Sequence, residues 1–127
     1  MVTETDSVTK HVLVVDDEPD LRTLLRWVLE LDDRCGSIAE AIDGESAIRE
    51  AERFAPNAVI LDFMLGDSTA DQVLPGLRAA CPNARIVVYT AAPERAEAAG
   101  VMDRGADAVA AKAGVNVDDL VDIALIG

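Results

Sequence analysis

Short apolar runs alternate along the chain with longer segments in which apolar residues recur at helical spacing. Unbroken runs of four apolar residues occupy positions 12–15, 58–61 and 86–89. Such runs are typical of parallel strands that are covered on both faces. Weaker runs lie at 37–41, which contains Glu40, and at 107–111, which is rich in small side chains. The pattern therefore predicts five strands, with these last two at the edges of the sheet.

The segments between the strands predict five helices. Leu21, Leu24, Leu25 and Val28 follow the i, i+3, i+4, i+7 spacing of one apolar helix face. The other helices are expected after the Asp43–Gly44 turn, at a capping box on Thr69, at Pro93 and at Val117. Pro75 predicts a kink or a late start in the third helix, and the fourth is expected to reach roughly Arg104.

Strict alternation of strands and helices indicates an α/β fold with right-handed crossovers. A length of 127 residues suits an open, doubly wound parallel sheet of five strands and five helices. An eight-unit barrel needs roughly 250 residues and is excluded. We expect one domain over residues 11–127, preceded by a polar leader at 1–10.

Reactive side chains follow the strands at the edge where open parallel sheets build their sites. They are Asp16, Asp17 and Glu18 after the first strand, Asp62 after the third, Thr90 after the fourth and Lys112 after the fifth. Clustered carboxylates repel one another unless a cation neutralises them, and aspartate oxygens are ligands that Mg²⁺ prefers. A metal, an ammonium and a hydroxyl around a carboxylate can stabilise phosphoryl transfer to that carboxylate. The sequence therefore predicts a Mg²⁺ site and an acyl phosphate on Asp62.

Composition narrows the classes of partner. The formal net charge is −13 and the isoelectric point is near 4.2, so direct binding of nucleic acid through bulk charge is not expected. No apolar stretch approaches the ~18 residues of a membrane span. Cys35 and Cys81 are single and far apart in sequence, which favours neither a zinc site nor a redox pair. We expect a cytoplasmic protein.

Five motifs occur in order on the expected elements: VVDDEP at 14–19, AIDGESA at 41–47, ILDFM at 60–64, TA at 90–91 and AK at 111–112. Together they resemble response-regulator receiver domains, the CheY-like phosphoacceptor family of two-component signalling. The resemblance covers residues 11–126 and implies a flavodoxin-like (βα)5 fold with strand order 2-1-3-4-5.

The resemblance also implies roles for individual residues. Asp62 would accept phosphate from a histidine kinase or a phosphotransfer protein. Asp17 and Asp62 would bind Mg²⁺ together with the backbone carbonyl of Met64, and Asp16 would help through a water. Lys112 would pair with the phosphoryl group. The chain would signal by protein contact rather than act as a metabolic enzyme.

Switching and dephosphorylation depend on neighbouring positions in this family. Thr90 would bond a phosphoryl oxygen and draw its loop inward on activation. The aromatic residue that often lies three positions before the lysine is Val109 here, so the usual coupling to Thr90 is altered. Met64 and Ala92 stand where the family tunes hydrolysis, and neither orients a water well. We therefore expect slow self-dephosphorylation.

Two other functions stay open. A pseudo-receiver would bind partners without phosphate. Val109 favours this alternative, as does Gly66, which stands where the family frequently has proline after the phosphoacceptor. The complete acidic site with Lys112 opposes it. An aspartyl phosphohydrolase would place its nucleophile after the first strand in an Asp-x-Asp motif, whereas Asp16 is followed by Asp17 and Glu18.

Two surfaces are candidates for protein contact. Trp27 is expected to pack over the rim of the core, with contact to a kinase as the competing hypothesis. The last helix is apolar on more than one face, so Ile123 or Ile126 is a candidate for a homodimer or effector interface through the fourth and fifth helices.

Overall fold

Five parallel strands form the central sheet of the protein. A computed structural model describes residues 9–66 and 68–126. The strands are β1 (Lys10–Val15), β2 (Cys35–Ala41), β3 (Ala58–Asp62), β6 (Arg85–Thr90) and β7 (Ala108–Ala111). Their order is β2-β1-β3-β6-β7, and every neighbouring pair is parallel. Counted along the main sheet this is the order 2-1-3-4-5, so the predicted fold is confirmed, with β2 and β7 at the edges.

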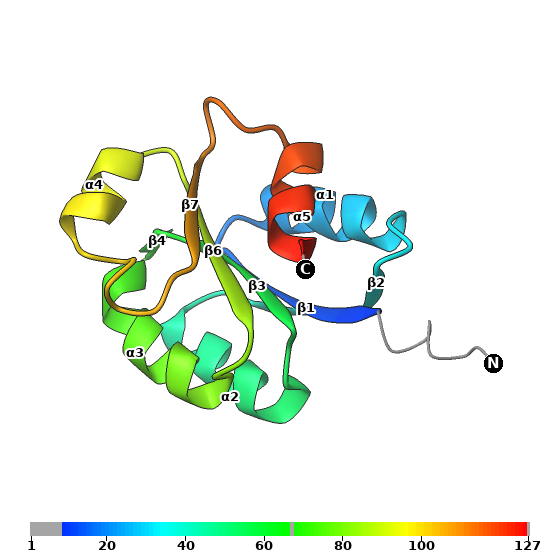
Figure 1. The fold of residues 1–127 in the computed structure, drawn as a ribbon, viewed down its shortest axis with the longest axis horizontal. Helices are drawn as coiled ribbons and strands as arrows, with labels where there is room; N and C mark the ends of the chain where they lie inside the picture. The colour runs from blue at the N-terminus through cyan, green and yellow to red at the C-terminus, as the bar shows by residue number, and fades with distance from the viewer. Residues whose placement is uncertain (1–8, 67, 127) are drawn as a thin grey trace.

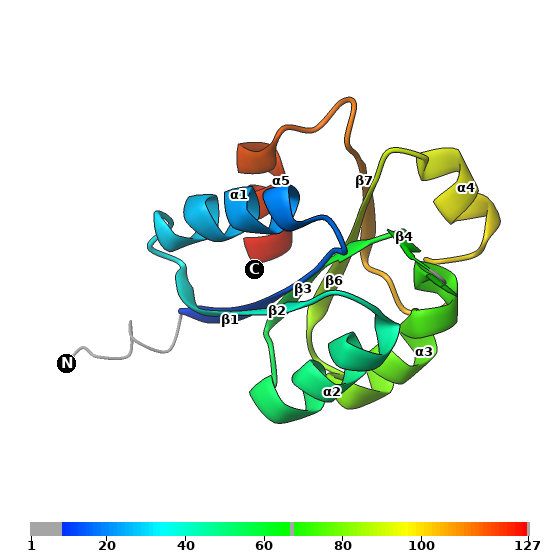
Figure 2. The same cartoon turned by 180° about the vertical axis from the view of Figure 1, so that it is seen from behind.

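Helices cover both faces of this sheet (Figures 1 and 2). The elements are α1 (Pro19–Glu30) and α5 (Val117–Leu125) on one face, and α2 (Gly44–Phe54), α3 (Ala70–Ala80) and α4 (Pro93–Ala98) on the other. Side chains alternate across each strand, so Val12 and Val14 pack under α1 and α5 while Leu13 and Val15 pack under the opposite helices. The reactive strand ends are thereby fixed between two apolar layers.

The helix starts follow the local signals. Pro19 occupies the first turn of α1, where a missing N–H costs nothing. Leu25 and Leu29 of α1 are fully buried, and each contributes roughly 1.5–3 kcal/mol through burial. At the start of α2, Oδ1 of Asp43 accepts a hydrogen bond from the backbone N–H of Ser46 at 2.8 Å. The starts of α1 and α2 therefore lie at the same edge of the sheet as Asp16.

The third helix does not start late. α3 begins at Ala70, directly after Thr69, whose backbone N–H donates to Oε1 of Gln72 at 3.1 Å. Pro75 lies inside the helix and removes one N–H donor from it. Burial of Leu74 and Leu77 offsets that loss, because both side chains are completely covered.

The fourth helix is shorter than predicted, because α4 ends at Ala98 rather than near Arg104. Gly100 follows with a φ of +79°, a left-handed conformation that ends a helix and that glycine adopts without strain. The chain then turns so that Val101 is fully buried in the core. Tertiary burial of this valine therefore decides where the helix stops.

A small hairpin after β3 is not signalled by the hydrophobic pattern. The strands β4 (Met64–Leu65) and β5 (Ser68–Thr69) pair antiparallel. Gly66, between them, has a φ of +75°. Two-residue strands are too short to produce a periodic signal, so only the folded chain reveals them.

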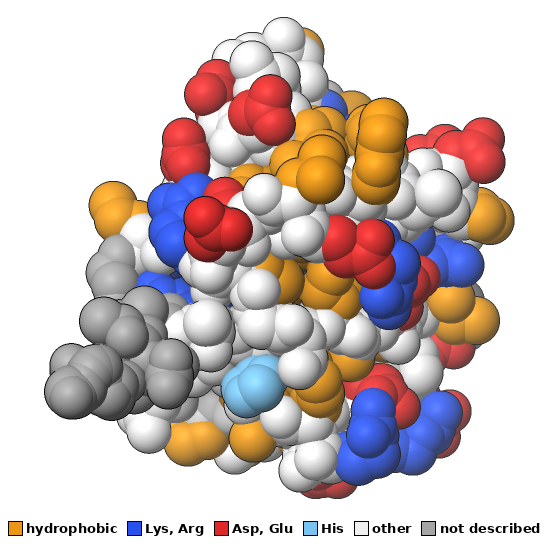
Figure 3. All heavy atoms as spheres, turned by 90° about the vertical axis from the view of Figure 1, so that its right-hand side faces the viewer, with side chains coloured by type: hydrophobic (Ala, Val, Ile, Leu, Met, Phe, Trp, Pro, Cys, Tyr) orange, Lys and Arg blue, Asp and Glu red, His pale blue; other side chains and the backbone are white. Residues whose placement is uncertain are grey.

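The predicted leader at 1–10 falls mostly outside the described residues, and Lys10 is the first residue of β1. Its Nζ donates to the carbonyl of Leu125 at 2.9 Å, which joins β1 to the end of α5. Figure 3 shows this end of the molecule, with basic side chains lying against acidic ones. Within residues 9–66 and 68–126, no helix is long and apolar enough to cross a membrane.

Candidate functional site

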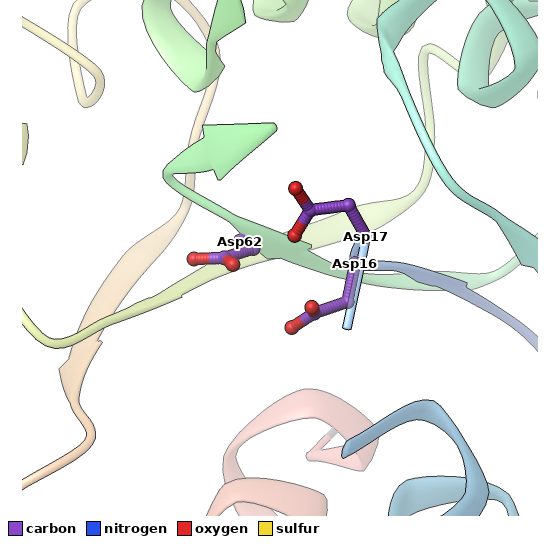
Figure 4. A group of neighbouring side chains, drawn as sticks. All are labelled: Asp16, Asp17 and Asp62. Carbon is purple, nitrogen blue, oxygen red and sulfur yellow. The ribbon is translucent and has the colours of Figure 1, made fainter. Parts of the chain in front are cut away.

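Three carboxylates meet at the carboxyl edge of the sheet. Asp16 and Asp17 directly follow β1, and Asp62 is the last residue of the neighbouring strand β3. Figure 4 shows the three side chains beside one another with their oxygens pointing the same way. One oxygen of each lies within 4.8 Å of one oxygen of the others. Parallel pairing of β1 with β3 therefore creates a cluster from positions far apart in sequence.

Asp16 is the most buried member, with only 3% of its surface exposed. Its Oδ1 accepts a hydrogen bond from the backbone N–H of Glu18 at 2.8 Å. Burial raises the pKa of Asp16, although this hydrogen bond and the charge of Lys112 act in the opposite direction. A nearby cation would relieve the cost of keeping this carboxylate ionised.

Asp62 has a side chain that is 11% exposed, so it is covered but open to the cleft. Burial, followed by the negative charge of Asp16, raises the pKa of Asp62 to about 6. The ammonium of Lys112 and the backbone N–H of Met64 oppose this rise. A carboxylate held in this way gains stability from any cation that joins the cluster.

Lys112 reaches into the acidic cluster from the end of β7. Its Nζ lies 3.6 Å from Oδ2 of Asp62 and 3.9 Å from Oδ2 of Asp16. The backbone N–H of Lys112 donates to the carbonyl of Thr90 at 2.8 Å, and its ammonium stands 5.5 Å from the ring centre of Tyr89. β6 and the aromatic ring therefore fix the direction of the lysine.

Thr90 closes the site on the side of β6. It is 1% exposed, and its Oγ1 accepts a hydrogen bond from the backbone N–H of Ala92 at 3.0 Å. Thr90 lines the same cleft as Asp62. Val109 lies in β7, three residues before Lys112. It is partly buried against the core on the side of the sheet that α4 covers.

An open cleft with a volume of about 590 Å³ lies over Asp17, Asp62, Thr90 and Lys112. Its lining is Asp17, Glu18, Pro19, Asp62, Met64, Thr90, Ala91, Ala92, Arg95 and Lys112. Arg95 was not anticipated from the sequence. It lies in the first turn of α4, with its guanidinium 5.9 Å from the ring centre of Phe63. The signal that could have identified it is its place just after the reactive end of β6.

The donor set suits a hard divalent cation. Asp16, Asp17 and Asp62 supply carboxylate oxygens only, and Lys112 leaves part of their negative charge uncompensated. Oxygen-only ligands and retained waters are characteristic of Mg²⁺ sites. The expected contribution of the Met64 carbonyl stays a prediction.

The side chains of Glu18, His11 and Trp27 do not belong to the acidic cluster. Glu18 is exposed and caps the start of α1 without a side-chain cap bond. His11 packs edge-on against Phe54, with ring centres 5.5 Å apart. The expectation that Trp27 covers the core rim is wrong, because Trp27 is 63% exposed. α1 turns this side chain outward rather than toward Leu25 and Leu29.

The chain is similar in sequence to named response regulator proteins. It is 34% identical over 97 residues to the nitrate/nitrite response regulator protein NarP of Escherichia coli, covering 76% of this chain and 45% of that protein. It is 32% identical over 96 residues to a nitrate/nitrite response regulator homologue of Haemophilus influenzae, covering 76% of this chain and 46% of that one. The chain thus spans less than half the length of these relatives.

Solved structures share the fold. A two-component response regulator of the LuxR family from Aurantimonas superposes with a TM-score of 0.79 at 26% identity, covering 90% of this chain and 81% of that one. A response regulator from Burkholderia pseudomallei, crystallised with a phosphorylated aspartic acid, calcium and citrate, gives 0.80 at 27% identity, covering 91% and 66%. Residues 12–124 match the family described as response regulator receiver domain. The chain belongs to this family, the receiver domains of two-component response regulators.

Proposed function

We propose that this receiver domain accepts a phosphoryl group on Asp62 from a histidine kinase or a phosphotransfer protein in a Mg²⁺-dependent reaction. The observation that carries the proposal is the meeting of Asp16, Asp17 and Asp62 with Lys112 at one sheet edge. The Burkholderia regulator, which is 27% identical, supports it because that structure contains a phosphorylated aspartic acid.

In the proposed transfer, a carboxylate oxygen of Asp62 attacks the phosphorus atom of phosphohistidine. An O–P bond forms, the N–P bond of the donor breaks, and the electron pair leaves with the imidazole nitrogen. The Lys112 ammonium, 3.6 Å from Oδ2 of Asp62, offsets negative charge on the transferring group. The Thr90 hydroxyl, which accepts a hydrogen bond from the backbone N–H of Ala92, would donate a hydrogen bond to a phosphoryl oxygen.

Asp17 and Asp62 would hold Mg²⁺ directly, with the carbonyl of Met64, while Asp16 acts through a water. When bound, Mg²⁺ supplies positive charge that offsets the charge on phosphoryl oxygens. The protein itself controls the ionisation of Asp62, through burial and neighbouring charges. A pKa of about 6 leaves this carboxylate largely ionised near neutral pH and available for attack.

The consequence of phosphorylation is a shift between surface states that a partner reads. Trp27, at 63% exposed on α1, is a candidate contact for the kinase. Ile126, at 60% exposed after α5, is a candidate for a homodimer or effector contact near α4 and α5. The same proposal includes three further points. The domain promotes its own gain and loss of phosphate, it contacts neither nucleic acid nor membrane directly, and it is cytoplasmic.

The test is intact mass after incubation with acetyl phosphate, with and without Mg²⁺. The expected result is a gain of one phosphate that requires Mg²⁺ and is lost in Asp62→Asn. Asp71→Asn is the matched control, because Asp71 lies in α3 and its carboxylate accepts from Thr69 rather than joining the cluster. This control should gain phosphate as the wild type does.

The same experiment addresses the pseudo-receiver alternative. A protein that gains no phosphate from acetyl phosphate or from a phosphorylated kinase, yet stays folded, would contradict the proposal and favour phosphate-independent binding. Sustained release of phosphate from a small substrate would favour an aspartyl phosphohydrolase instead.

A further inference from the structure

Arg22 reaches back from α1 to the backbone of the acidic cluster. Its Nη1 donates a hydrogen bond to the carbonyl oxygen of Asp16 at 2.8 Å. The Arg22 side chain is only 17% exposed, so the contact is sheltered from competing water. This residue was not singled out by sequence, where it reads as an ordinary polar position of an amphipathic helix.

A carboxylate on the neighbouring edge strand orients the guanidinium. Nε of Arg22 donates to Oε1 of Glu40 at 3.1 Å, while Nη1 donates to Asp16. The other oxygen of Glu40 accepts from Nε of Arg26 at 2.6 Å. Because a guanidinium presents its donors in a rigid fork, two acceptors in different directions leave Arg22 little freedom.

The carbonyl that Arg22 holds belongs to the peptide that joins Asp16 to Asp17. The backbone N–H of Asp16 is also held, since it donates to the carbonyl of Ala41 at 3.1 Å. Asp17, by contrast, is exposed, and no hydrogen bond or ion pair holds its carboxylate among residues 9–66 and 68–126. The position of the Asp17 carboxylate therefore depends on the backbone that carries it.

We infer that Arg22, oriented by Glu40, is a positioning residue for the cation site. By fixing the peptide between Asp16 and Asp17, it keeps both carboxylates directed toward Asp62 before a metal binds. This inference rests on the proposed Mg²⁺ site and adds a residue that touches neither metal nor phosphate. Residues that orient metal ligands commonly contribute 10- to 100-fold in affinity, roughly the scale expected here.

Arg26 provides a matched control. It carries the same charge on the same helix and pairs with the same Glu40, but the acidic cluster receives no hydrogen bond from it. If Arg22 acted only through its positive charge, its removal would strengthen cation binding, because a repulsive charge would be lost. The positioning role predicts the opposite sign.

The experiment measures the Mg²⁺ dissociation constant of the full chain by calorimetric titration with MgCl₂. Arg22→Gln should bind Mg²⁺ about tenfold more weakly than the wild type. Arg26→Gln should stay within about twofold of it, because its exposed charge is largely screened. Circular dichroism in EDTA establishes that each variant is folded at the assay temperature.

Lysine variants keep the inference testable if Arg22→Gln does not fold. Arg22→Lys retains the charge but loses the fork and should weaken binding by about threefold, whereas Arg26→Lys should not. Equal or tighter binding in the Arg22 variants than in their Arg26 counterparts would overturn the positioning role alone. A wild type that binds no Mg²⁺ would overturn the proposed metal site, and this inference with it.

Discussion

Nζ of Lys112 lies 3.6 Å from Oδ2 of Asp62, although the two residues come from strands that are not adjacent in the sheet. The side chain of Lys112 crosses the end of β6 to reach the carboxylate, and the ring of Tyr89 stands beside it. The ammonium of Lys112 therefore lies beside the Asp62 carboxylate, where the proposed phosphoryl transfer needs a positive charge.

Replacement of this lysine should impair phosphorylation. Lys112→Met is expected to lower the rate of phosphorylation by acetyl phosphate about 100-fold, because one preorganised positive charge is removed from the reacting group. Intact mass over time measures this rate. Lys10→Met is the control, since Lys10 is the other lysine of the chain and binds the carbonyl of Leu125 at the end of α5. A wild-type rate of phosphorylation in Lys112→Met would show that Lys112 does not take part in the reaction.

Ionisation of Asp62 should cost stability in the absence of metal. Its pKa is about 6 in the folded protein against an ordinary value of 3.8, so the unfolded chain ionises at lower pH than the folded one. The cost is absent below pH 4, grows between pH 4 and 6, and is complete above pH 6. Asp62→Asn should therefore stabilise the metal-free protein at pH 8 by up to about 3 kcal/mol, with little gain at pH 4.

Urea unfolding in EDTA at the two pH values measures this difference. Asp103→Asn serves as the control, because Asp103 is exposed on the turn after α4. If Asp62→Asn raised the free energy of unfolding equally at both pH values, the ionisation of Asp62 would not be the source of the added stability.

Mg²⁺ should stabilise the folded protein, and its removal should lower the melting temperature. In the proposed site Mg²⁺ binds the ionised carboxylates of the folded chain, so its addition should raise the melting temperature more at pH 8 than at pH 5, where Asp62 is largely protonated. Asp17→Asn should lose most of this rise. Thermal unfolding with MgCl₂ or EDTA provides the comparison, and a rise that is independent of pH would argue against Asp62 as a ligand.

Trp27 should matter for transfer from a protein donor and not for stability. Because its side chain is 63% exposed, Trp27→Ala should change the free energy of unfolding by less than about 1 kcal/mol. Transfer from a partner histidine kinase should slow by about tenfold, while the rate with acetyl phosphate stays unchanged. Met102, which is 49% exposed on the turn after α4, offers the matched Met102→Ala control. Unchanged kinase transfer would exclude Trp27 from the interface.

The acyl phosphate should be long-lived. Met64 and Ala92 line the cleft around Asp62, and neither side chain carries a group that orients an attacking water through a strong hydrogen bond. Met64→Asn combined with Ala92→Glu should shorten the lifetime by about tenfold, measured by loss of the phosphate mass after the donor is removed. Rapid decay in the wild type that survives both replacements would contradict this explanation.

The hydrophobic pattern was enough to predict the fold class and the residues at the acidic edge of the sheet. Apolar runs at 12–15 and 58–61 specify covered parallel strands through their local pattern, and the residue after such a strand lies at the reactive edge whatever the details of packing. Asp16, Asp62 and Lys112 could be identified for this reason.

How these side chains are held, and which groups surround them, depends on contacts that form only in the folded chain. The pKa of Asp62 depends on burial and on the distance to Asp16, and neither is encoded in a local window. The bond from Arg22 to Asp16 needs α1 to cross beside Glu40 of β2, and the end of α4 depends on burial of Val101. Such features arise from contacts between distant segments, whereas periodicity reports only which face of its own element a residue occupies.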